Sequence, residues 1–232
     1  MIRAVLTIDD IPSRVTPAIV DCLRARGITA LMFAEGQRLE MYPEEAVYAL
    51  QKGMIVGNHS WSHPHFSSLP YEEGVREIER CEEELDELYA RAGVPRRFRP
   101  FRFPYGDKGG ANREAFGRYL KDRGFSKLRD DAVSWPWWRE QGLDRDISTF
   151  WTFDFMEYRI RPGSGFLGDD VFRRILDPAP AAGAPLLKDG GSHILLLHAH
   201  DETEKTLPGY YRLFIDALLE HDVVFDPPAF FD

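Results

Sequence analysis

The chain of 232 residues has few cysteines, no long apolar stretch and no block of like charges. Its two cysteines, Cys22 and Cys81, are too few for a disulfide framework and fit a reduced compartment. No apolar stretch approaches the roughly twenty residues that a membrane-spanning helix needs, so we expect no membrane span. Met1 is followed at once by a strand-like segment, so no secretory signal is visible and we expect a cytoplasmic location.

The chain also lacks an excess of basic residues, with 29 Lys and Arg against 38 Asp and Glu. The net charge of −9 argues against nucleic acid or an anionic membrane as the main partner. Hydrophobic residues make up 44% of the chain and charged residues 29%, which is ordinary for a globular protein. The length suits a single domain, and we expect one catalytic domain over residues 1–232. A homo-oligomer is compatible with the sequence, which leaves the oligomeric state open.

Short apolar segments alternate with amphipathic ones along the chain. Strands are expected at residues 4–9, 28–36, 54–60, 99–106, 125–131, 148–155, 193–200 and 223–227. Helices are expected at residues 16–27, 42–53, 71–91, 112–124, 169–176 and 207–222, the first with Thr16 as its N-cap. This alternation predicts a parallel sheet, and seven or eight such units predict a complete or incomplete barrel.

Polar side chains gather where the expected strands end. They are Asp9, Asp10, His59, His63, Arg102, Tyr105, Asp154, Glu157 and His198. Active sites of barrels with parallel strands lie at the carboxyl ends of those strands. We therefore expect these residues, although far apart in the sequence, to meet at one rim.

The segment from Val56 to Phe66 holds three of the seven histidines in the chain. His59 and His63 are four residues apart, which on a helical turn would let both bind one ion, but no carboxylate lies between them. Asp10 would complete a set of three ligands with one open position, as hydrolytic metal sites have. His65 is expected to be a loop residue or to support a ligand through a hydrogen bond.

The remaining polar residues supply what metal-assisted hydrolysis needs. A bound divalent ion makes water a nucleophile, and Asp9 could contact that water. In an extended strand Asp9 and Asp10 would face opposite ways, but at a strand end the chain can turn, so that one binds metal and the other contacts the bound water. His198 is the candidate to protonate the leaving amine, and the backbone N–H of Tyr105 the candidate donor to the oxyanion.

Five segments, in order, resemble the motifs of the polysaccharide deacetylase family, the NodB-homology enzymes of carbohydrate esterase family 4. They are TIDD (residues 7–10), HSWSH (59–63), RFPYG (102–106), FDFMEY (153–158) and LLLH (195–198). The resemblance implies an α/β fold, a distorted (β/α)7–8 barrel, and hydrolysis of an N-acetyl or similar acyl group from an amino sugar. The implied substrate is a small molecule or an oligosaccharide.

The resemblance also implies roles for residues. A divalent metal, usually Zn²⁺ and sometimes Co²⁺, Ni²⁺ or Fe²⁺, would be bound by Asp10, His59 and His63. Asp9 would be the base and His198 the acid. Arg102 would orient Asp9, and Asp154 and Glu157 would tune the arginine and histidine partners. Tyr105 would donate its backbone N–H. Leu196 would line the pocket for the acetyl group.

The chain departs from the family pattern at the edges that face substrate. Ile11 replaces a glycine, Glu157 and Tyr158 replace Asp-Trp, and Ala199 replaces an aspartate. These changes favour metal-assisted amide hydrolysis over any particular polymer. His200 and Asp201 are candidates to replace the acid lost at position 199, and His193 is expected to be structural.

Two alternatives stay open. One is a hydrolase of a cyclic amide or another non-sugar C–N bond, with or without metal; the intact Asp-His-His set argues against the metal-free form. The other is an inactive carbohydrate-binding homologue, against which the retained Asp9 and His198 argue. An iron oxygenase is disfavoured, because its carboxylate ligand usually lies two residues after a histidine. Trp135 and Trp137 either contact a sugar ring or cap the core.

Overall fold

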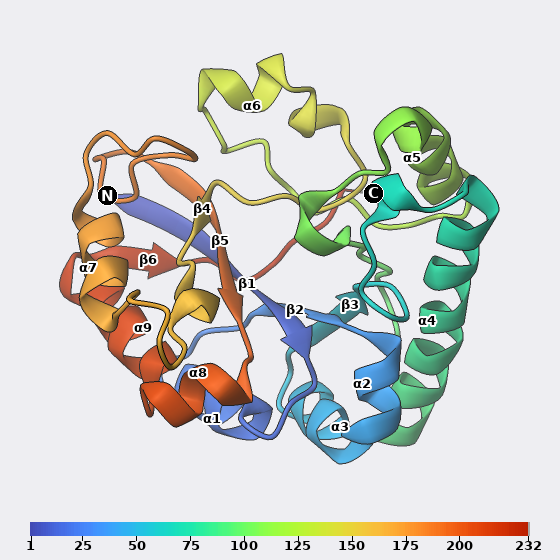
Figure 1. Ribbon diagram of the computed structural model, residues 1–232, viewed down its shortest axis with the longest axis horizontal. Coiled ribbons are helices and arrows are strands. Elements are labelled where there is room, and N and C mark those ends of the chain that lie inside the picture. Colours follow the sequence, from blue (N-terminus) through green and yellow to red (C-terminus); the bar gives the residue numbers. More distant parts are fainter. Residues whose placement is uncertain (232) are drawn as a thin grey trace.

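The computed structural model describes residues 1–231, in which six strands form one parallel sheet (Figure 1). The strands are β1 (Ile2–Ile11), β2 (Leu31–Ala34), β3 (Ile55–Asn58), β4 (Phe153–Asp154), β5 (Ser192–His198) and β6 (Val223–Phe225). Their order is β3-β2-β1-β5-β4. β1 is the central strand: it pairs with β5 along one edge, and with β6 near its start and β2 near its end along the other.

Two irregular segments close the sheet into a distorted barrel. The Arg102 N–H donates to the Asn58 carbonyl of β3 at 3.0 Å, and the Thr149 N–H donates to the Phe101 carbonyl at 2.8 Å. The chain from Thr149 then runs into β4, which pairs with β5. The strand expected at 99–106 is reduced to a single bridge at Phe101, since the prolines at positions 100 and 104 have no N–H for a ladder.

Helices lie around the outside of the barrel (Figure 1). They are α1 (Thr16–Ala25), α2 (Gly36–Met41), α3 (Pro43–Gln51), α4 (Tyr71–Ala92), α5 (Arg113–Asp122), α6 (Pro136–Glu140), α7 (Gly168–Leu176), α8 (Asp201–Thr206) and α9 (Tyr210–Glu220). The six expected helices are present, whereas the short helices α2, α6 and α8 were not expected. Within residues 1–231, no helix combines the length and apolar content that crossing a membrane requires.

Two expectations about local structure are wrong. Thr16 is the first residue of α1 rather than its cap; Val15 holds the cap position, and the Thr16 hydroxyl accepts the Ser13 N–H at 2.8 Å. The strand expected at 125–131 is only an isolated antiparallel bridge between Leu128 and Phe230. Its apolar residues still pack inward, so the pattern reported burial rather than strand pairing.

The barrel interior is apolar up to the rim at which the strands end. Leu6, Ile8, Leu195 and Leu197 of the two central strands are fully buried. Parallel strands covered by helices are buried on both faces, which explains their nearly continuous apolar sequences. The polar residues at the ends of these strands therefore lie directly above a packed apolar core.

Candidate active site

A bulge at the end of β1 brings two neighbouring carboxylates to the same rim. Ile8 pairs with Met32 and Ile11 pairs with Ala34, so β1 has one residue more than β2 over this stretch. Asp10 has a left-handed backbone, with φ of 62°, a conformation that aspartate tolerates better than most residues. The turn expected at this strand end is present, and both Asp9 and Asp10 line one cavity.

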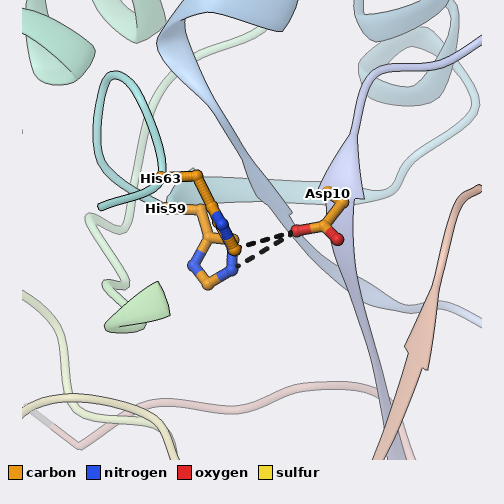
Figure 2. A group of neighbouring side chains, drawn as sticks. All are labelled: Asp10, His59 and His63. Atoms are coloured by element: carbon orange, nitrogen blue, oxygen red, sulfur yellow. Dashed lines mark ion pairs between the residues drawn. The ribbon is translucent and has the colours of Figure 1, made fainter. Parts of the chain in front are cut away.

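Asp10, His59 and His63 point toward one another (Figure 2). Asp10 Oδ1 lies 3.3 Å from His63 Nε2 and 3.6 Å from His59 Nε2. Among the described residues this buried oxygen has no hydrogen-bond partner. An unsatisfied buried carboxylate oxygen between two imidazole nitrogens fits a divalent cation.

The protonation of His59 also suits a metal ligand. Its Nδ1–H donates to the Arg102 carbonyl at 2.8 Å, which leaves the Nε2 lone pair facing Asp10. Burial lowers the pKa of His59 to about 4, so the imidazole is neutral at pH 7. Burial raises the pKa of Asp10, but the hydrogen bond from His200 and the neighbouring histidines hold it well below its ordinary value.

The histidine segment is a loop rather than the helical turn considered from the spacing. Ser60 and His63 both have left-handed backbones, with φ of 67° and 57°. The Asn58 side chain accepts the Ser60 N–H at 2.7 Å, and the Ser60 hydroxyl accepts the His63 N–H at 3.2 Å. These short-range hydrogen bonds curl the loop, so the two imidazoles converge without a helix.

Asp9 lies beside the histidines and is held by a buried arginine. The Arg102 guanidinium donates to Asp9 Oδ1 at 2.7 Å and to the Thr7 hydroxyl at 2.8 Å. Burial lowers the pKa of Arg102, and the charge of Asp9 opposes that effect. Asp9 Oδ2 lies 3.5 Å from His59 Nε2, so one carboxylate oxygen is fixed while the other faces the candidate ligands.

His198, at the end of β5, pairs with a fully buried carboxylate. Glu157 Oε1 accepts the backbone N–H of His198 at 2.5 Å and lies 3.0 Å from its Nδ1. Burial lowers the pKa of His198, but the charge and hydrogen bond of Glu157 outweigh it and raise the pKa to about 10. His198 is therefore a cation at neutral pH. Burial also raises the pKa of the neighbouring Asp154, to about 6.

A cavity of about 480 Å³ joins these groups. It is lined by Asp9, Asp10, Glu35, Arg38, His59, His63, Tyr105, Trp151, Asp154, Tyr158, Arg161, Leu196, His198 and His200. Eight of the twelve residues predicted for the site therefore line one space. Arg102 and Glu157 are fully buried and contact lining residues from behind.

Comparison with known proteins decides the family. The sequence profile of the polysaccharide deacetylase family matches residues 2–125, more than half of the chain. The chain belongs to the polysaccharide deacetylase family. A similar relative is the peptidoglycan-N-acetylmuramic acid deacetylase PdaC of Bacillus subtilis, 28% identical over 203 residues. The match covers 86% of the chain but only 39% of PdaC, so the chain spans about two fifths of that relative.

Solved structures of family members share the fold. The peptidoglycan N-acetylglucosamine deacetylase Bc1960 superposes with a TM-score of 0.67 at 20% identity, covering 97% of the chain and 85% of Bc1960. BA3943 from Bacillus anthracis, described as a pseudoenzyme, superposes with a TM-score of 0.58 at 20% identity, covering 96% and 63%. The distorted barrel of this family is thus the fold of the chain, and activity must be argued from its own residues.

Trp135 and Trp137, for which substrate contact and capping of the core were both considered, lie outside the cavity of this family member. Trp135 is 9% exposed, packs in the core and donates its indole N–H to the Ser192 carbonyl at 3.2 Å. Trp137 lines a neighbouring cavity of about 600 Å³ that shares Trp151 and Asp154 with the first one. The structure thus supports the capping alternative for Trp135 and leaves Trp137 one cavity away.

Tyr105 is an exposed lining residue of the cavity and contacts His65, which lies outside the lining. The Tyr105 ring is 58% exposed and stacks on the His65 ring with centroids 4.0 Å apart. Tyr105 has a left-handed backbone, with φ of 58°, and Gly106 after it has φ of 66°. A Cβ at Gly106 would lie 2.8 Å from an aromatic carbon of Trp151, so this turn requires glycine.

Sequence reasoning missed four lining residues: Glu35, Arg38, Trp151 and Arg161. Glu35 directly follows β2 and could have been found by the rule that gave Asp9 and His198. Arg38 lies on α2, which was not expected, and Arg161 lies beyond the fourth motif. No sequence signal marked these two.

Proposed function

We propose that the chain is a metal-dependent deacetylase that hydrolyses an N-acetyl or similar acyl group on an amino sugar or a small amide. One observation carries the proposal: the Asp10, His59 and His63 cluster lies in one cavity with Asp9 and His198. Membership of the polysaccharide deacetylase family supports the amide bond of an N-acyl group as the bond that is hydrolysed. The names of PdaC and Bc1960 support an acylated amino sugar as substrate.

The metal site is proposed from the donor set. Two imidazoles and one carboxylate are ligands that suit zinc, and cobalt, nickel or iron could replace it. Asp10 Oδ1, which accepts no hydrogen bond from the described residues, is the strongest single indication of a bound cation. When bound, a divalent ion would make water acidic and polarise the acyl carbonyl.

Asp9 and His198 divide the proton transfers between them. Asp9 accepts the proton of the attacking water, and the Arg102 guanidinium fixes the carboxylate that does so. His198 is held as an imidazolium by Glu157 and donates a proton to the amide nitrogen as the C–N bond breaks. The products are a carboxylic acid and a free amine. The Tyr105 N–H is the proposed hydrogen-bond donor to the carbonyl oxygen.

The walls of the cavity suit a sugar carrying a short acyl group. Leu196 is an apolar lining residue and is proposed to contact the acyl methyl. Arg38 and Arg161 lie at the same cavity, and each is paired with a carboxylate, Glu35 and Glu202 respectively. Polar groups of this kind can fix the hydroxyls of a sugar ring.

Release of acetate tests the proposal. Purified protein is loaded with Zn²⁺ and incubated with N-acetylglucosamine oligomers and with an N-acetylmuramic acid glycan. Acetate is expected from at least one substrate, and Asp9→Asn and His198→Asn are each expected to lower kcat by about 10²–10⁴-fold. His221→Asn, at an exposed position after α9, is the control. Equal rates for wild type and both site variants would refute the proposed roles.

A further inference from the structure

The two oxygens of the Asp10 carboxylate have different neighbours. Oδ1 faces His59 and His63 and has no hydrogen-bond partner among the described residues. Oδ2 lies 2.5 Å from the Nε2 atom of His200, which is two residues beyond the end of β5. Because a carboxylate only accepts, His200 Nε2–H is the donor. The donor fixes the rotation of the carboxylate about its own axis.

The backbone of His200 and of the next residue is held by hydrogen bonds. Its backbone N–H donates to the Tyr210 hydroxyl at 3.2 Å, and that hydroxyl donates to the His198 carbonyl at 2.5 Å. Tyr210 is fully buried on α9. The next residue, Asp201, accepts the Val15 N–H at 2.9 Å, which ties this segment to the loop that follows Asp10.

His200 occurs where the sequence departs from the family pattern. Ala199, which replaces an acidic residue, is fully buried and uses its backbone N–H to donate to the Asp9 carbonyl at 3.0 Å. Its methyl group can make no polar contact with the site. The next side chain along the segment is His200, and it reaches Asp10.

We propose that His200 is a positioning residue for the metal site: its Nε2–H holds Asp10 Oδ2 so that Oδ1 is the oxygen presented to the ion. This inference rests on the proposed metal-dependent function. Hydrogen bonds from behind a ligand orient it and increase metal affinity. A histidine that donates Nε2–H to the carboxylate cannot use the same nitrogen as a ligand, so His200 acts through Asp10.

Zinc affinity measured without substrate tests this role. Apo forms of wild type, His200→Ala, His200→Gln and His221→Ala are titrated with Zn²⁺ against a competing chelator. We expect His200→Ala to bind zinc about 10–100-fold more weakly than wild type. The Gln side chain carries an N–H donor at a similar distance from the backbone, so His200→Gln is expected to recover most of the affinity. His221→Ala, at an exposed position after α9, is expected to match wild type.

Three outcomes would overturn the inference. One is wild-type affinity in His200→Ala. Another is the same loss in His200→Gln as in His200→Ala, because a donor would then not be what matters. The third is a count of three histidine ligands by X-ray absorption in the zinc-loaded wild type, which would make His200 a ligand. Thermal unfolding of each apo form shows that affinities are compared between folded proteins. Failure of the wild type to bind zinc would instead refute the proposed function.

Discussion

Replacing Glu157 by Gln should shift the pH range in which His198 can act as an acid. Glu157 is fully buried, and its Oε1 contacts both the backbone N–H and the Nδ1 of His198. Glutamine has the same shape and keeps a carbonyl oxygen for the backbone N–H, but it has no charge. The change therefore removes the largest attraction that keeps the imidazole protonated, leaves the smaller ones of Asp10 and Asp154, and leaves the burial that opposes protonation.

The size of the effect follows from the pKa of His198. Its rise from the ordinary 6.5 to about 10 corresponds to about 5 kcal/mol of preferential stabilisation of the imidazolium. Because the folded-state pKa lies above the unfolded one, this contribution to stability is complete below pH 6.5 and is lost as the pH rises toward 10. In Glu157→Gln the pKa of His198 should fall, and a full return to the ordinary 6.5 would leave roughly 3% of the imidazole protonated at about pH 8.

The assay is the pH dependence of kcat/KM for acetate release, which reports the essential acid of the free enzyme. Wild type should keep its activity up to about pH 10, whereas Glu157→Gln should lose activity at a lower pH and recover it as the pH falls; the loss at about pH 8 is roughly 30-fold for a full return of the pKa to 6.5. Glu220→Gln, at the end of α9, is the matched control. An alkaline limb at the same pH in both proteins would refute the pairing argument, and a loss that acid does not reverse would indicate damage to the fold.

Further predictions concern buried groups outside the proton transfers. Arg102→Met leaves the Asp9 carboxylate buried without its arginine partner and should lower the free energy of unfolding in urea by about 3–5 kcal/mol. A decrease of less than about 1 kcal/mol would contradict this. Burial lowers the pKa of His193 to about 4, so its contribution to stability is complete above pH 6.5 and is lost as the pH falls toward 4. His193→Gln should therefore remove up to about 3 kcal/mol of acid sensitivity between these pH values, and unchanged acid sensitivity would contradict this. Gly36→Ala places a methyl group 2.2 Å from a ring carbon of Trp61 and should lower the free energy of unfolding by about 1–3 kcal/mol. Gly117→Ala meets open space and should raise it by about 0.5–1 kcal/mol. Equal melting temperatures of the two variants would refute both predictions.

The convergence of distant residues could be predicted from the sequence because it depends only on topology. Alternating strands and helices give a parallel sheet, and polar residues at strand ends then share a rim. Asp9, His59 and His198 are the clearest examples, each at or just beyond the end of a strand. Helices with a proline in the first turn and a glycine just after the end could also be predicted, because the backbones of these two residues set the limits of a helix.

Details that depend on local backbone geometry could not be predicted. A turn was expected where the strand with Asp9 and Asp10 ends, but not its form, which is one extra residue that bulges out of β1. The histidine loop curls through hydrogen bonds of Asn58 and Ser60 that spacing alone does not reveal. Trp135 is core because its indole meets the Ser192 carbonyl across the fold, a contact separated by 57 residues.

The metal content of the purified protein tests the central claim most directly. Wild type and His63→Ala are analysed by mass spectrometry after purification and after reconstitution with Zn²⁺. Wild type is predicted to hold about one equivalent of a divalent ion per chain, and His63→Ala to lose it. Wild type that carries no metal and takes up none on reconstitution would contradict the Asp10, His59 and His63 site.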